Sequence, residues 1–185
     1  MTRPRAVGRP SQKNAILEAS LQIIRDGEQV SMDSAARAVG LTKPGLMYHF
    51  PDKEKLVTAL VDHVLDGYEQ RLTEILGEAG DSPQNKLRAY VTWAITGRHD
   101  PADLVMMCDP RLMQQMAERW GERMTPWFAI PAATAEATRT RWRAARFIAD
   151  GAWFNAASGM PHSDDRDQER LLELAIKLIE GTTPL

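Results

Sequence analysis

Two stretches of the sequence carry side chains suited to chemistry. The first reads LTKPGLMYHF from residue 41 and brings an amine, a phenol and an imidazole together at Lys43, Tyr48 and His49. These groups can neutralise or hydrogen-bond phosphates, and a lysine can also reach the acceptor atoms of guanine. Pro44 and Gly45 add little bulk beside them, so the backbone can approach a partner closely. This stretch therefore predicts contact with a polyanion.

The second stretch contains His99, Asp103 and Cys108, which raise the question of an enzyme or a metal site. His99 and Cys108 are nine residues apart, which places them on different helical turns, and no oxyanion-type glycine motif accompanies them. A buried structural cysteine is the simpler interpretation. His99 and Asp103 have the spacing of two metal ligands, and residues 162–165 (HSDD) could add more, but no third ligand follows at metal-site spacing and these later acids suit a helix cap. No Gly-rich phosphate loop is present. We expect no enzyme, cofactor or metal.

Composition is that of a folded protein. The 185 residues, 43% of them hydrophobic, are enough for one large domain or a small domain and a larger one. No apolar run approaches the roughly eighteen residues of a membrane helix, and no signal-peptide-like stretch follows the N-terminal arginines. The single cysteine cannot form a disulfide within the chain, which agrees with a reducing compartment. We therefore expect a cytoplasmic protein without a membrane partner.

Charge is distributed unevenly along the chain. Residues 1–51 contain seven Lys or Arg and four acids, a balance of +3, so the remaining 134 residues carry −5. The first ten residues, MTRPRAVGRP, are typical of a mobile basic arm. Such a distribution indicates that the N-terminal part meets a polyanion, although it also fits an ordinary solvated surface.

Two helices are predicted ahead of residue 41. Ser11 can cap a helix through about Asp26, with its apolar residues on one face and Gly27 at its end. Ser31 can cap a shorter helix, and Gly40 then lets the chain reverse. The first chemical stretch thus follows a tight turn.

A third helix is predicted within that stretch. Thr42 can cap it, and Pro44 fits the first turn because backbone N–H groups there have no intrahelical acceptor. Leu46 and Phe50, at i and i+4, can pack on the two earlier helices. The residues left largely outward are Lys43, Pro44, Gly45, Met47, Tyr48 and His49.

Two short helices joined by a glycine-containing turn, behind a first helix and a basic arm, have the layout of a helix-turn-helix DNA reader. Residues 31–56, SMDSAARAVGLTKPGLMYHFPDKEKL, resemble the N-terminal signature of TetR-type transcriptional regulators. The positions that fit are Gly40, Leu41, Thr42, Leu46, His49, Phe50 and Lys53. Met47 departs from the pattern, which usually has a phosphate-binding tyrosine there, and Tyr48 can take over that contact. Ala35 also stands where a larger aliphatic residue is usual.

The resemblance implies contacts with double-stranded operator DNA. The residues it assigns to the groove and the phosphates are Ser31, Thr42, Lys43, Pro44, Gly45, Tyr48, His49 and Lys53. Lys53 would contact the DNA backbone from the start of the fourth helix. Ser31 would contact the DNA from the second helix. The other interpretation is a compact three-helix corner with no role in DNA binding.

The rest of the chain also reads as helical. Asp52 can cap a long connecting helix over about 52–79, which the segment 80–83 (GDSP) breaks. Later helical segments are separated by prolines and by an Ala/Thr-biased link over 131–141, and no alternating run predicts a strand. The proline breaks are placed at Pro101, Pro110, Pro126, Pro131 and Pro161. We expect an all-α fold, with a helix-turn-helix domain over 1–51 and a ligand-binding and dimerisation bundle over 52–185.

The C-terminal part is rich in large, adaptable apolar residues. Such residues more often form a core than a pocket, but the resemblance implies an inducer site, drawn from 90–116 and 142–154 and nearby residues. The candidate lining residues are Tyr90, Trp93, Met106, Met107, Met113, Met116, Trp120, Trp127, Phe147 and Phe154. The effector would be a small hydrophobic molecule. A lipophilic cation is one option, because Asp100, Asp103 and Asp109 lie beside the aromatic residues, although helix capping is the simpler role for these acids.

Two C-terminal segments suit dimerisation. Residues 142–160 are apolar nearly all round with many small residues, and residues 166–181 are amphipathic. Two such helices can form one half of a four-helix bundle across a two-fold axis. A homodimer of this kind would read a pseudo-palindromic operator. The alternative is that both helices close the core of a monomer.

Together these features predict a TetR-like transcriptional regulator, a repressor that a small ligand releases from DNA. Two alternatives are a helical small-molecule-binding protein without DNA binding and a small helical enzyme that uses Cys108.

Overall fold

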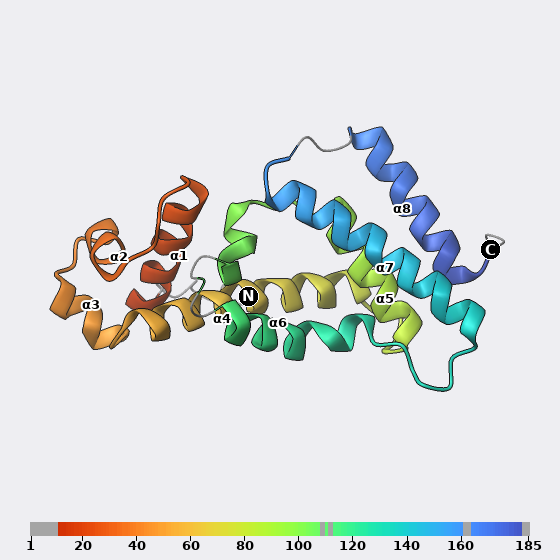
Figure 1. The fold of residues 1–185 in the computed structure, drawn as a ribbon, viewed down its shortest axis with the longest axis horizontal. Coiled ribbons are helices and arrows are strands. Elements are labelled where there is room, and N and C mark those ends of the chain that lie inside the picture. Colours follow the sequence, from red (N-terminus) through yellow and green to blue (C-terminus); the bar gives the residue numbers. More distant parts are fainter. Residues whose placement is uncertain (1–10, 108–109, 111–112, 161–163, 183–185) are drawn as a thin grey trace, which may run out of the picture. The chain divides into compact units, whose positions relative to one another are not determined.

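The computed structural model describes residues 11–107, 110, 113–160 and 164–182, and for residues 106 and 107 only the helix that contains them. Over this part of the chain the structure is all helical and contains no strand, as the sequence predicts. It divides into two compact units, 1–60 and 61–185 (Figure 1). The division falls within α4 (Lys53–Leu76), whereas the sequence placed a boundary ahead of that helix. No helix among the described residues is long and apolar enough to cross a membrane.

The first unit contains three short helices and the start of α4. They are α1 (Gln12–Arg25), α2 (Met32–Ala38) and α3 (Lys43–His49). The predicted caps of these three helices are confirmed: the hydroxyl oxygens of Ser11, Ser31 and Thr42 accept from backbone N–H groups three residues on, at 3.2, 3.0 and 3.2 Å. Gly40, in the turn between α2 and α3, has φ of 69°, a conformation that glycine adopts without strain.

The core of the first unit is small and apolar. α2 packs on α1 and α3 packs on α2. Leu46 is fully buried and Phe50 is 2% exposed, alongside Ile16 of α1 and Ala35 of α2. The inward pair predicted for the third helix is therefore confirmed. The small Ala35, at a position where a larger side chain is usual in TetR-type proteins, is itself fully buried.

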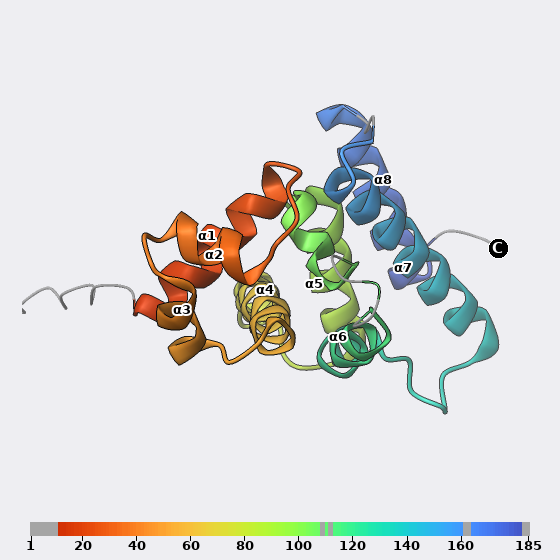
Figure 2. The same cartoon turned by 60° about the vertical axis from the view of Figure 1, so that its left-hand side comes forward.

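The second unit contains the rest of α4 and five further helices. These are α5 (Pro83–Thr96), the 3-10 helix η1 (Pro101–Met107), α6 (Met113–Phe128), α7 (Glu136–Ala157) and α8 (Asp165–Glu180). α5 packs against α6, α7 and α8, and α8 lies along α7, as both views show (Figures 1 and 2). The indole of Trp142 on α7 donates to the carbonyl of Ile179 at 3.1 Å in a buried hydrogen bond. This bond fixes α7 to α8.

Three helix boundaries differ from the prediction. α4 ends at Leu76 rather than near residue 79, because Gly77 takes a left-handed conformation with φ of 51°. α6 continues through Pro126, which lies so close to the helix end that the lost N–H weakens only the last turn. α7 begins at Glu136, so half of the predicted Ala/Thr link is helical, in keeping with the helix propensity of alanine.

Candidate nucleic-acid interface and ligand cavity

The outer face of α3 is open to solvent. Tyr48 is 87% exposed, Met47 is 46% exposed, and Lys43 and Pro44 are also exposed. His49 is half-buried beside Tyr48, and the two rings meet edge to face with centroids 5.2 Å apart. A seven-residue helix has little stability of its own, so its buried anchors hold this polar face in place.

The N-terminal end of α3 is unusually tight. Thr42 accepts from the N–H of Gly45 through Oγ1, which leaves its hydroxyl hydrogen available for a second partner. A Cβ atom at Gly45 would lie 3.3 Å from that same Oγ1. Glycine therefore preserves the cap and keeps this end of the helix narrow. The N–H groups of the first turn also favour an anion.

Lys43 on α3 forms an ion pair with Asp33 on α2, with Nζ and Oδ2 3.1 Å apart. Both side chains are more than half exposed, at 52% and 62%. An ion pair this exposed contributes little stability. Lys43 can therefore exchange Asp33 for a phosphate at low cost.

The remaining predicted DNA contacts lie at helix starts. Ser31 is the N-cap of α2 and is half-buried, with its Oγ bonded to the backbone N–H and the hydroxyl of Ser34, both at 3.0 Å. Its oxygen thus already serves the helix cap. Lys53 is the first residue of α4 and is also half-buried. The predicted basic arm, residues 1–10, lies outside the described residues.

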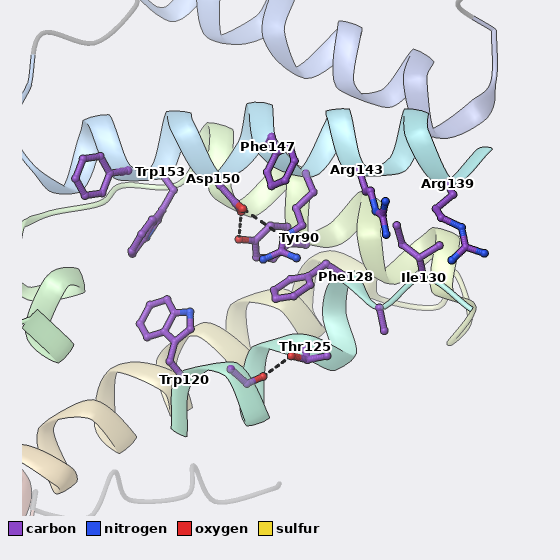
Figure 3. A pocket seen from close by; sticks show the side chains of 14 residues that line it. Tyr90, Trp120, Thr125, Phe128, Ile130, Arg139, Arg143, Phe147, Asp150 and Trp153 are labelled. Carbon is purple, nitrogen blue, oxygen red and sulfur yellow. Dashed lines mark hydrogen bonds and ion pairs between the residues drawn. The ribbon is translucent and has the colours of Figure 1, made fainter. Parts of the chain in front are cut away.

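The second unit contains a cavity of about 700 Å³ between α5, α6 and α7 (Figure 3). α6 contributes Trp120, Thr125 and Phe128 from one side, and α7 contributes a row of arginines and aromatic residues from the other. The lining residues are Tyr90, Trp120, Gly121, Thr125, Phe128, Ala129, Ile130, Arg139, Arg143, Arg146, Phe147, Asp150, Trp153 and Phe154.

Four of the predicted lining residues are in this cavity: Tyr90, Trp120, Phe147 and Phe154. Four others lie outside the lining: Trp93, Met113, Met116 and Trp127. Trp93 packs instead on Tyr68, with ring centroids 4.5 Å apart, and Met116 is fully buried in the core. Met113 is exposed and Trp127 is half-buried. The side chains of Met106 and Met107 lie outside the described residues.

The charged residues of the α7 wall were missed by sequence reasoning, whereas Phe147 and Phe154 of the same helix were predicted. The sequence-based interpretation concentrated on large apolar residues, whereas α7 lines the cavity with Arg139, Arg143, Arg146 and Asp150 as well. Their spacing of four, three and four residues repeats along one helical face. This repeat of charged residues along one helical face is the sequence signal that could have predicted the charged wall of the cavity.

Tyr90 and Asp150 form a hydrogen bond in the cavity wall, in which the phenol donates to Oδ1 at 2.5 Å. The other carboxylate oxygen of Asp150 lies 3.2 Å from Nε of Arg146, and the guanidinium of Arg146 stands over the ring of Phe128, 3.7 Å from its centroid. Burial, and then the charge of Asp150, raises the pKa of Tyr90. The phenol therefore remains a hydrogen-bond donor at neutral pH.

The acids near the end of α5 serve local structure. Nδ1 of His99 lies 3.0 Å from Oδ2 of Asp103, and its Nε2 lies 3.2 Å from the carbonyl of Trp93. Asp100 accepts from a backbone N–H through Oδ1 at 2.8 Å. A Cβ atom at Gly97 would lie 2.6 Å from the His99 ring, so glycine permits this close approach. Capping and ring positioning thus account for Asp100 and Asp103.

Two buried polar atoms lie at the edge of the cavity that Trp153 lines. The Tyr68 hydroxyl and Nε1 of Trp153 have no hydrogen-bond partner among the described residues. Burial, and then the nearby Asp103 carboxylate, raises the pKa of Tyr68. The rings of Tyr68 and Trp120 meet edge to face, with centroids 5.4 Å apart. The aromatic core and the cavity wall are therefore continuous.

Within the described part of the chain, no three His, Cys, Asp or Glu side chains gather as metal ligands. Cys108, Asp109 and His162 lie outside the described residues, so the structure does not place the thiol of the enzyme alternative.

Residues 16–60 match the family model for bacterial regulatory proteins of the tetR family. The chain is also 25% identical over 156 residues to the HTH-type transcriptional regulator EthR of Mycobacterium tuberculosis, covering 80% of this chain and 72% of that protein. The match to the tetR family thus covers the DNA-binding part of the chain. A second relative, the nucleoid occlusion factor SlmA of Marinobacter nauticus, is 31% identical over 75 residues, which is 40% of this chain and 38% of that protein.

Solved structures show the same fold. The crystal structure of Mycobacterium smegmatis AmtR superposes with a TM-score of 0.62 at 17% identity, covering 96% of this chain and 89% of that one. The chain is therefore a helix-turn-helix DNA-binding regulator with an all-helical C-terminal part, as the sequence predicts.

Charge fixes α6 to α4 within the second unit. Arg119 makes a bidentate contact with Asp62, whose Nη2 to Oδ2 distance is 2.7 Å. Arg123 donates to Glu69 from Nε at 2.9 Å and to Asp66 from Nη2 at 2.8 Å. These hydrogen bonds to carboxylates raise the pKa of both arginines. We call these five residues the α4–α6 clamp.

Proposed function

We propose that the protein is a homodimeric repressor that binds a pseudo-palindromic operator and leaves it when a small ligand enters the cavity between α5, α6 and α7. It acts on DNA in the cytoplasm and catalyses no reaction. The observation that carries the proposal is the contrast on α3. Leu46 and the adjoining Phe50 are buried, while Tyr48 is 87% exposed and Lys43 and Pro44 lie open beside it.

This contrast suits DNA reading. The buried anchors fix the direction of α3, and its narrow N-terminal end can enter a major groove. Lys43 then exchanges Asp33 for a phosphate or a guanine acceptor, and Tyr48 donates to a phosphate in place of the tyrosine that Met47 replaces. Thr42 adds its free hydroxyl hydrogen. Phosphate contacts set affinity, so their loss weakens binding on every sequence.

The exposed face of α7 and α8 supports the homodimer. Phe147 of α7 is 67% exposed and Leu174 of α8 is 42% exposed. A groove of about 310 Å³ between these helices is lined by small and apolar residues including Phe147, Gly151 and Leu171. Large exposed apolar side chains around a groove mark an interaction surface. A second copy of this face would cover them with two-fold symmetry.

The α4–α6 clamp supports release by a ligand. α6 lines the cavity with Trp120 and Phe128, and its Arg119 and Arg123 bind α4. α4 itself contains residues of both compact units. Ligand binding that shifts α6 therefore shifts α4, and the population moves toward dimers whose reading helices no longer match both half-sites.

The test is binding of the purified protein to duplexes from the intergenic region beside its own gene, measured by fluorescence anisotropy at several salt concentrations. We expect tight binding whose affinity falls steeply with salt. Lys43→Ala should weaken binding by at least about tenfold and reduce the magnitude of the salt slope by about two, because each subunit of the dimer loses one contact. A phosphate contact predicts the same loss on every operator variant, whereas a guanine contact predicts a loss only on duplexes that contain that guanine.

Arg71→Ala is the matched control, because Arg71 is an exposed basic residue of the second unit whose ion pair among the described residues is with Glu74 of its own helix. It should leave the operator affinity unchanged. An affinity independent of salt, or an equal loss for both variants, would contradict the proposed function.

A further inference from the structure

The wall that α7 contributes to the cavity is cationic. Arg139, Arg143 and Arg146 all line the cavity, whereas Asp150 is the acid among the lining residues described. Figure 3 shows Arg139 and Arg143 extending from α7 on the side that faces Phe128. The positive charge of this wall thus exceeds its negative charge.

Two of these arginines already have partners. Arg146 is paired with Asp150 and stacked on Phe128, so its charge is balanced. Arg139 donates from Nη2 to two backbone carbonyls of the preceding loop, at 2.7 and 3.1 Å. Carbonyls orient the guanidinium of Arg139 without neutralising it. The side chain is held in place and still attracts an anion.

Arg143 has neither a hydrogen bond nor an ion pair within the part of the chain that the structure describes, and it is exposed to the cavity opening. A guanidinium presents parallel N–H donors that match a carboxylate in two simultaneous hydrogen bonds. Arg143 is one helical turn from Arg139, so both can face one anionic group.

The remainder of the lining is apolar and aromatic. Trp120 and Phe128 of α6 face the α7 wall, which also contains Trp153 (Figure 3). Phe154 of α7 belongs to the lining as well. A volume of about 700 Å³ falls within the size range of cavities that enclose small organic ligands. The cavity thus has a cationic end and an aromatic body.

We propose that the effector of this cavity is an organic carboxylate with an aromatic or aliphatic body. Its carboxylate binds Arg143 and Arg139, and its body lies against Trp120 and Phe128. This inference rests on the proposed function, in which the cavity is the effector site, and names the chemical class of the ligand.

A lipophilic cation, one option from the sequence, fits this cavity less well. Asp100 and Asp103 are not among the lining residues and accept hydrogen bonds from the backbone and from His99. The carboxylate within the lining, Asp150, is already shared by Tyr90 and Arg146.

The test compares three probes that share one body and differ in charge: 4-phenylbutyrate, 4-phenylbutanol and 4-phenylbutylamine. A second series of decanoate, decanol and decylamine covers an aliphatic body. Isothermal titration calorimetry on the full chain without DNA gives each Kd. We expect the carboxylate of at least one series to bind about tenfold or more tightly than its alcohol and its amine.

Arg143→Gln should remove that preference and bring the carboxylate close to its alcohol, and Arg143→Lys should restore part of it, because an ammonium keeps the charge and loses the paired donors. Arg170→Gln is the matched control, since Arg170 is an exposed arginine of α8 outside the lining. Circular dichroism confirms that each variant is folded.

Three outcomes would overturn the inference: an amine or alcohol that binds as tightly as its carboxylate, an Arg143→Gln variant with an unchanged Kd, or no binding by either carboxylate. The salt-dependent operator assay on the same sample decides the proposed function separately. A failure of the ligand class is therefore distinguishable from a failure of DNA recognition.

Discussion

The reading face and the cavity are built in opposite ways. The candidate DNA contacts occupy one continuous stretch, 31–53, whereas the cavity lining comes from α5, α6, α7 and the loop between the last two. In the first, neighbours in sequence are neighbours in space, and two buried side chains orient the whole face. In the second, each helix contributes one edge, so the lining depends on how helices pack. Local sequence patterns therefore specify the DNA-reading part, and tertiary packing specifies the ligand-binding part.

The largest effect is expected from Phe50→Ala, which removes a large side chain from the small core of the first unit. A buried Phe→Ala replacement costs about 3–5 kcal/mol of unfolding free energy, which is much of the stability of a unit this small. Operator binding should be lost. Ligand binding in the second unit should persist, as calorimetry and hydrogen exchange can measure together. Loss of both activities would show that the two regions are not separable.

An intermediate effect is expected from Arg123→Gln in the α4–α6 clamp. The variant loses hydrogen bonds to Glu69 and Asp66, and partial exposure to solvent limits the destabilisation to about 1 kcal/mol. Arg123 is not among the cavity-lining residues, so the Kd for ligand should stay unchanged. The reduction in operator affinity caused by ligand should shrink. Anisotropy titrations with and without ligand measure this, and an undiminished ligand effect would exclude the clamp from the coupling.

The smallest effect is expected from Asp33→Asn on the reading face. This change releases Lys43 from its ion pair and removes a negative charge beside the DNA, so operator affinity should rise roughly twofold. Thermal stability should hardly change, because the pair is exposed. In the Lys43→Ala background, Asp33→Asn should give a smaller gain, because only the removal of the negative charge then contributes. Weaker binding by the single variant would indicate that Asp33 positions Lys43 rather than competing for it.

Much of the fold could be predicted because its signals are local. In the first unit, serine and threonine caps fix where the helices begin. Gly40, with its left-handed backbone, fixes the turn between α2 and α3. The i, i+4 pair of Leu46 and Phe50 fixes the buried side of α3. In the second unit, Asp164 caps α8 as its position ahead of an amphipathic segment indicated. The helix break predicted at Pro126 is wrong, because a proline close to the end of a helix removes few hydrogen bonds and does not interrupt it.

The cavity was only partly predictable, because apolar side chains look alike in sequence whether they form a core or a wall. Trp93 and Trp120 are both large aromatics, but the first packs into the core against Tyr68 and the second lines the cavity. Packing against neighbouring helices sets the rotation of each helix about its own axis, and this rotation decides whether an aromatic side chain faces the core or the cavity. The charges of α7 were a further signal beside its aromatic residues Phe147 and Phe154, since a row of arginines on one face of a helix needs a solvated or anionic partner.

Phe147 stands at the border of two spaces, since its ring lines both the cavity and the groove between α7 and α8. If a second subunit occupies that groove, the Phe147 ring contacts both the small ligand and the partner subunit. Ligand binding and dimerisation are then linked equilibria. The factor by which dimerisation changes the affinity for the ligand must equal the factor by which the ligand changes the affinity between subunits, so dilution into monomers also changes the affinity for the ligand. Effector sensitivity would vary with how abundant the regulator is.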